Sequence, residues 1–181
     1  MNHNANAVTV RFLTISRCRV REHYGPKLRQ CLEALGPDAL WHLDDEHVGR
    51  PIGAIVRHLL EHIQRHITWI HTGARPSAPA RLEDFFPTTG ELPAALAECA
   101  ADIIATWDDA MAGLIRQVAE IGVLPSNGPG IDAIYHLVEH VSYHLGQVVV
   151  LTAKAAKREF AFCQRGINEA GLAKAVDAEM P

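Results

Sequence analysis

The sequence has few of the features that mark several large classes of protein. Its four cysteines stand far apart with no C-x-x-C pair, which argues against a disulfide framework and a cysteine zinc site. The formal net charge is −4, and no block of lysine or arginine is long enough for a nucleic-acid patch. No apolar run approaches the roughly 18 residues of a membrane span, and the first residues lack the apolar segment of a signal peptide. We therefore expect a cytoplasmic protein with no nucleic-acid or membrane partner and with reduced cysteines, at least three of them in the core.

Strand patterns are also nearly absent. Residues 148–151 (VVVL) are prone to form a strand, but they lie within an unbroken helical period. Elsewhere, apolar residues recur at three- and four-residue spacing between proline and glycine breaks. Gly25-Pro26 falls inside the first such stretch, where the proline should kink or split the helix. The spacing predicts a short helix near 168–178 and four long helices over residues 8–35, 51–72, 92–121 and 131–156.

A long connection with several prolines joins the second and third predicted helices. It is too long for a tight turn, so it is expected to cross the molecule. A chain of 181 residues corresponds to one domain on the usual length scale. The sequence therefore predicts a single-domain, all-α four-helix bundle with a long crossover between helices two and three, a core over about residues 8–160 and a short helical tail.

Histidines are clustered on two of the predicted helices. Residues four apart lie on nearly the same face of a helix, so a pair at that spacing can bind one metal ion, and a histidine from another helix can complete the site. Six of the eleven histidines form two ladders with this spacing: His58, His62 and His66 on the second helix, and His136, His140 and His144 on the fourth.

The angular position of each histidine indicates which of them face the core. Relative to Val141, at the centre of the apolar stripe of the fourth helix, His144 lies about 60° away, His140 about 100° and His136 about 140°. His140 and His144 therefore border the core, and His136 should turn towards solvent. The same reasoning on the second helix, centred on Ile63, favours His62 or His66 over His58 as the third ligand. It leaves the choice open, because the rotation of one helix against the other is unknown.

Residues 132–147 (DAIYHLVEHVSYHLGQ) resemble the helix-four signature of the DinB-like (YfiT-like) superfamily of metal-binding four-helix bundles. In that signature a histidine, three residues, a second histidine and a glycine-glutamine pair follow in order, as His140, His144 and Gly146-Gln147 do here. Residues 51–59 are similar to the family stretch that supplies the first ligand, a histidine directly before a leucine. Weaker similarities at 24–27 and 81–85 extend the resemblance to about residues 10–165.

The resemblance implies a metal triad of His58, His140 and His144, against the angular preference for His62. The chain departs from the family pattern at Glu61-His62, where relatives often have Gly-Asn. His62 is therefore a candidate supporting partner, alternative ligand or substrate contact. Side chains that could orient a ligand or reach the cavity are Glu61, Glu139, Gln147, Tyr135 and Tyr143.

Three histidines leave at least one coordination position open, which is typical of catalytic rather than structural zinc sites. We expect zinc or nickel, with iron, manganese and copper as alternatives. Such an ion could lower the pKa of a bound water or thiol. Binding should weaken below about pH 6, as imidazoles with a reference pKa of about 6.5 take up protons.

Two functions from different classes fit these expectations. The resemblance implies a thiol-dependent S-transferase or a metal-dependent hydrolase acting on a small molecule, with a low-molecular-weight thiol as a candidate cosubstrate. The alternative is a non-catalytic metal-binding or stress-related bundle protein, and a metal-free fold with buried histidines is a third reading. A homodimer is expected through an apolar patch formed by Trp69, Phe85 and Phe86.

Overall fold

A computed structural model describes residues 3–42, 49–77, 86–87 and 89–180. Within these ranges the chain is all-α and contains no strand, as predicted. No helix among them is long and apolar enough to cross a bilayer. The elements in chain order are α1 (His3–Cys18), a π-helical segment (Arg19–Tyr24), α2 (Gly25–Glu33), α3 (Ile52–Thr72), α4 (Pro93–Ile121), α5 (Ile131–Ala156), a short 3-10 turn (Cys163–Arg165) and α6 (Glu169–Glu179).

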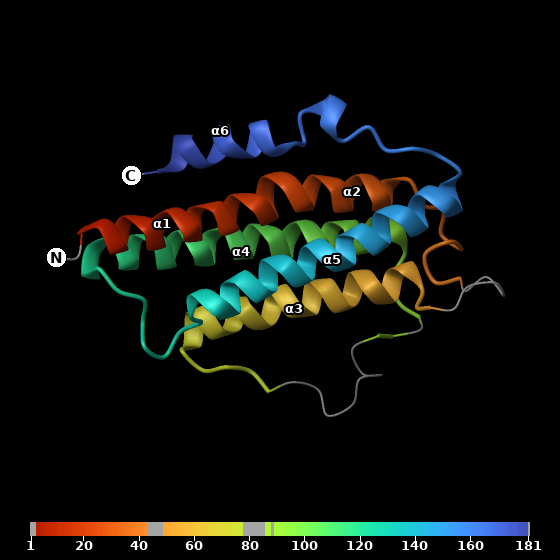
Figure 1. The fold of residues 1–181 in the computed structure, drawn as a ribbon. Coiled ribbons are helices and arrows are strands. Elements are labelled where there is room, and N and C mark those ends of the chain that lie inside the picture. Colours follow the sequence, from red (N-terminus) through yellow and green to blue (C-terminus); the bar gives the residue numbers. More distant parts are fainter. Residues whose placement is uncertain (1–2, 43–48, 78–85, 88, 181) are drawn as a thin grey trace.

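The long helices lie side by side along one axis (Figure 1). α3 packs against α5 and α4, while α1 and α2 follow one another along α4. α6 lies on the outside, against α1. One large apolar cluster joins α1 to α5, and Trp107 of α4 is completely buried within it. The packing of α3 on α5 brings the two histidine ladders to the same place.

The first helical segment changes its hydrogen-bond register before Gly25-Pro26. Residues Arg19–Tyr24 are π-helical, and the Gly25 N–H donates to the carbonyl of Val20, five residues back. Proline has no N–H to donate and crowds the preceding turn, and an extra residue in the turn accommodates it while the helical path continues. The sequence predicted a kink or a split at Gly25-Pro26, and the structure has a π-helical change of register just before it; the helical segment begins at His3 rather than near residue 8.

The other helix ends agree with the sequence signals. Gly73 and Gly122 end α3 and α4 in the left-handed conformation, with φ of 68° and 80°. Residues 148–151 are helical within α5, as predicted, and Asn168 caps α6 by accepting a hydrogen bond from the Gly171 N–H. The expectation for the cysteines was wrong in part. All four are free, but Cys18 and Cys31 are the ones buried, Cys99 is half-buried and Cys163 is exposed.

Trp41 fixes the start of α3 against the chain that leads into α4. Its indole N–H donates to the carbonyl of Glu91 at 2.8 Å, and the Gly53 N–H donates to the carbonyl of Leu40 at 2.8 Å. A Cβ on Gly53 would lie 2.7 Å from the indole ring, and one on Gly90 would lie 2.4 Å from it. Two glycines therefore make room for one rigid ring, next to the turn that carries His58.

Replacing Gly53 with alanine is expected to destabilise the protein by about 1–3 kcal/mol, the usual cost of overpacking. The ring faces the new methyl group and cannot bend away as a flexible side chain would. Gly113→Ala in α4 is the matched control, because its Cβ would meet only the Arg116 guanidinium at 3.9 Å. That change should stabilise the helix by about 0.5–1 kcal/mol. Urea unfolding measures both, and a Gly53→Ala variant as stable as the wild type would contradict the packing described.

Candidate metal centre

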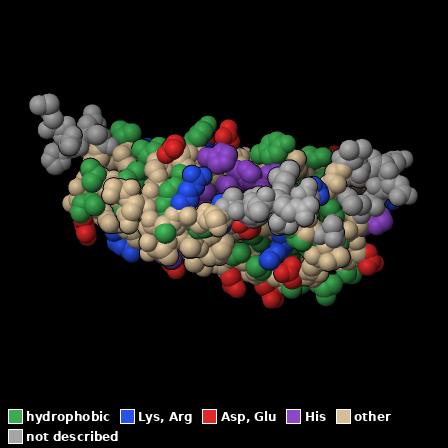
Figure 2. Space-filling view, turned by 90° about the horizontal axis from the view of Figure 1, so that it is seen from below, with side chains coloured by type: hydrophobic (Ala, Val, Ile, Leu, Met, Phe, Trp, Pro, Cys, Tyr) green, Lys and Arg blue, Asp and Glu red, His purple; other side chains and the backbone are tan. Residues whose placement is uncertain are grey.

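The structure brings together the three histidines of the predicted triad. His58 lies on α3, and His140 and His144 lie on successive turns of α5. One nitrogen from each can be chosen so that all three lie within 4.8 Å of one another. The His58 and His140 Nε2 atoms are 2.8 Å apart, and the ring of His144 is centred 4.7 Å from that of His58. Figure 2 shows histidine side chains gathered in one patch on this face of the molecule.

The contact between the His58 and His140 rings is a hydrogen bond that a bound metal ion would replace. At 2.8 Å, the N–H of one ring donates to the lone pair of the other. For both Nε2 atoms to bind one metal ion, the donating ring would carry its proton on Nδ1 instead, so that each neutral imidazole offers an Nε2 lone pair.

The burial of His58 runs against the angular preference for His62 or His66 as the third ligand. His58 is only 7% exposed, and the ring of Phe86 stacks on it with centroids 4.5 Å apart. Residues 51–56, at the start of α3, are all buried. Periodicity failed here because this end of the helix is covered on several sides, whereas the method assumes one buried stripe. His136 is exposed, as its angle predicted.

Burial keeps the two facing imidazoles neutral. Loss of solvation lowers the pKa of His58 to about 4, and repulsion from His144 acts in the same direction. The same two causes, in the same order, lower the pKa of His140 to about 4. Removal from water disfavours the charged form of a histidine. Both rings therefore have a lone pair available for a metal ion at neutral pH.

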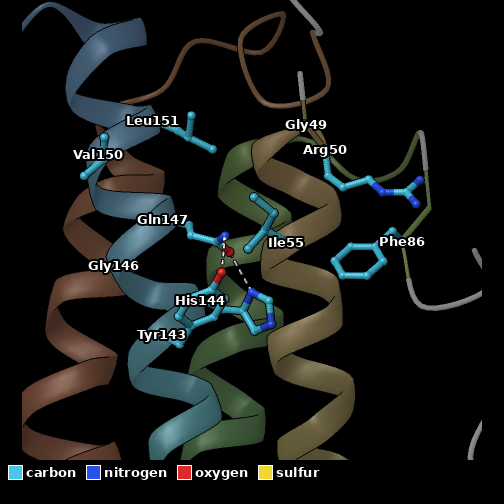
Figure 3. Close-up of a pocket in the computed structure, with 10 residues that line it drawn as sticks. All are labelled: Gly49, Arg50, Ile55, Phe86, Tyr143, His144, Gly146, Gln147, Val150 and Leu151. Carbon is cyan, nitrogen blue, oxygen red and sulfur yellow. Dashed lines mark hydrogen bonds between the residues drawn. The ribbon is translucent and has the colours of Figure 1, made fainter. Parts of the chain in front are cut away.

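Gln147 fixes the orientation of His144. The His144 Nδ1–H donates to Gln147 Oε1 at 2.8 Å, and the Gln147 amide donates to the hydroxyl of Tyr143 at 3.4 Å (Figure 3). With the proton on Nδ1, the Nε2 atom of His144 carries the lone pair. A hydrogen bond that fixes the tautomer and the ring direction is the usual support of a metal-binding histidine. This gives a physical role to one of the supporting residues predicted from sequence.

The other predicted candidates lie around the triad in different ways. His62 stacks on His140 with ring centroids 4.2 Å apart. Glu61 forms an ion pair with Arg65 at 3.5 Å, and Glu139 is exposed to solvent. His66, one of the two ligands that periodicity favoured, is buried, and its Nδ1–H donates to the backbone carbonyl of His62.

A cavity of about 570 Å³ opens beside His144. Ile55, Val150 and Leu151 supply apolar walls, and the Arg50 guanidinium lies over the Phe86 ring at 5.1 Å from its centroid (Figure 3). This volume falls in the range that accommodates small-molecule ligands. Sequence analysis did not find Arg50 or the role of Phe86, because both lie outside the helices and periodicity assigns no direction to such residues.

Comparison with protein-family models, with curated proteins and with solved structures gives no match. The resemblance to the DinB-like superfamily therefore stays a prediction, as does the homodimer. Of the aromatic residues expected at the dimer contact, Trp69 donates its indole N–H to Asn127 and Phe86 stacks on His58. Phe85 and the rest of the 81–85 segment lie outside the described residues.

Proposed function

We propose that this chain is a metal-binding four-helix bundle of the DinB-like type, in which His58, His140 and His144 bind one divalent ion, zinc or nickel. The observation that supports this most strongly is the meeting of three buried or half-buried imidazoles from two helices, with one ring oriented by Gln147. Imidazole nitrogen suits zinc, nickel, copper and iron, and an all-histidine triad is a known catalytic zinc set. α1 and α2 together count as the first helix of the bundle, and α6 is an external addition.

The same site supports chemistry on a small molecule. A bound zinc or nickel ion would supply Lewis acidity at an open coordination position, enough to favour the deprotonated form of a thiol or water there. The protein contributes the rest. The cavity next to His144 can bind an apolar body, the Arg50 guanidinium offers a charge for an anionic end, and Phe86 shields His58 from water. We therefore infer a metal-dependent thiol S-transferase or hydrolase.

A second candidate function is non-catalytic. The three ligands come from α3 and α5, so one ion would link two helices that already pack together. Such an ion would stabilise the folded state by mass action even without a substrate. This function predicts metal binding of the same affinity but no turnover.

A thiol and electrophile screen distinguishes the two functions. Protein purified without a histidine tag and loaded with zinc or nickel is incubated with glutathione, bacillithiol or mycothiol and an electrophile such as monochlorobimane, and with simple esters and amides. We expect turnover with the loaded wild type and none with the metal-free protein or with His144→Ala. His71→Ala, which changes an exposed histidine of the same helix α3, should retain full activity. Stoichiometric metal binding without any turnover would contradict the enzymatic function and favour the non-catalytic one.

A further inference from the structure

A second group of histidines lies directly beside the first and shares one member with it. His62 of α3 and His136 and His140 of α5 can each bring one nitrogen within 4.8 Å of the others. The ring of His62 is centred 4.2 Å from that of His140 and 5.7 Å from that of His136. The two triads are thus neighbours along the α3–α5 contact. We call His58, His140 and His144 the inner triad, and His62, His136 and His140 the outer triad.

The outer triad contains a buried nitrogen that lacks a hydrogen-bond partner among the described residues. Among the described residues, His62 Nε2 is buried and makes no hydrogen bond. Buried polar atoms are nearly always hydrogen-bonded, so an exception calls for a ligand, ion or water. His62 therefore presents a ring nitrogen that none of the described residues satisfies.

The two triads face different cavities. The inner triad meets the larger cavity through His144. His62 and His136 line a separate cavity of about 240 Å³, together with Arg65 and Arg75. His136 is exposed, so this second cavity reaches solvent beside a ligand of the outer triad. An ion at the outer triad would therefore be accessible from this second cavity.

We propose that the outer triad is a second binding site for the same kind of ion, a divalent transition metal that prefers imidazole nitrogen. The inference rests on the proposed function because the two sites share His140. A neutral imidazole has one nitrogen with a free lone pair while the other carries the proton. His140 can therefore serve one ion at a time, and the two triads are alternative sites for a single ion. The outer site should be the weaker one, because His136 is exposed and must be ordered on binding.

Four variants separate the two sites. His58→Ala/His144→Ala keeps the outer triad, His136→Ala keeps the inner triad, and the triple variant of these positions keeps neither. His71→Ala is the matched control on α3. Each is titrated with Zn²⁺ against a chromogenic chelator, and Co²⁺ absorption bands report the ligand field independently. Circular dichroism establishes that each variant is folded, and the single variant His144→Ala replaces the double variant if the latter fails to fold.

We expect the wild type, His71→Ala and His136→Ala to bind one equivalent tightly. The double variant should still bind one equivalent, at least about 10-fold more weakly, with an altered Co²⁺ spectrum, and the triple variant should bind none. Loss of all binding in the double variant, with His136→Ala unaffected, would overturn the second site and leave the proposed function intact. Loss of zinc binding in His136→Ala, with zinc binding by the double variant unchanged, would instead overturn the inner triad as the main site. Binding of two equivalents of zinc by the wild type would overturn the inference that His140 serves only one ion at a time.

Discussion

Replacing His140 with alanine is expected to abolish metal binding altogether. His140 belongs to both groups of histidines that can hold an ion, and its Nε2 atom lies 2.8 Å from that of His58. Its loss leaves two separated pairs: His58 with His144, and His62 with His136. Neither pair offers the three ligands that zinc takes from a protein at a catalytic site. His140→Ala should therefore have a larger effect than any other single histidine substitution.

The effect is measured in two ways. Elemental analysis of protein purified without a tag gives the bound metal, and thermal unfolding with added zinc gives the stabilisation that binding confers. At a free zinc concentration 100 times the Kd, the wild type should gain about 2.7 kcal/mol by mass action, and His140→Ala should gain nothing. His71→Ala should behave like the wild type. Equal metal content in the wild type and His140→Ala would rule out both histidine sites.

Acidification is expected to destabilise the metal-free protein between pH 6.5 and about pH 4. The pKa values of His58 and His140 fall from 6.5 to about 4 on folding, first because of burial and then because of repulsion from His144. Between these values the unfolded chain binds protons that the folded protein does not. The contribution of these residues to stability is therefore complete above pH 6.5 and is lost as the pH falls to about 4.

The same pKa values change the expected pH dependence of metal binding. An ordinary pKa predicts that affinity falls below about pH 6, but the folded imidazoles of His58 and His140 stay neutral to about pH 4. Protonation of His58 and His140 should therefore weaken zinc binding only near pH 4 and contribute little to any loss of affinity between pH 7 and pH 5. Calorimetric titration and urea unfolding at several pH values in this range test both statements, with the His58→Ala/His140→Ala variant as the control for unfolding. A loss of affinity between pH 7 and pH 6 that involves the uptake of two or more protons would contradict this electrostatic description.

Much of the fold could be predicted because it depends on local signals. Apolar spacing and glycine or proline breaks placed α3, α4 and α5 within one residue of their ends. Gly25-Pro26 marked the change of register in the first helical segment, although periodicity cannot specify a π-helical turn. The start of that segment was misplaced because residues 3–7 (HNANA) contain no large apolar residue that would mark a helical period.

The site could be predicted only in part, because it depends on how two helices face each other. The pattern within α5 was enough to select His140 and His144 and to turn His136 outwards. Periodicity ranked His58 below His62 and His66, because the burial of His58 depends on packing at the start of α3 and on Phe86 from a distant segment. Only the resemblance to the DinB-like superfamily pointed to it. The outer triad was not predicted, because the position of α3 along α5, which sets His62 beside His136, depends on long-range packing.

X-ray absorption spectroscopy of the zinc-loaded wild type at neutral pH tests the central claim most directly. The inner triad predicts nitrogen or oxygen neighbours at about 2.0–2.1 Å and no sulfur at about 2.3 Å. Outer-shell scattering should correspond to three imidazole rings, with one further light ligand. His140→Ala, which removes the histidine shared by both triads, should lose the bound zinc and with it this pattern, and His71→Ala should leave the pattern unchanged. A sulfur shell, or a spectrum with fewer than three imidazole rings in the wild type, would contradict a metal centre built from His58, His140 and His144.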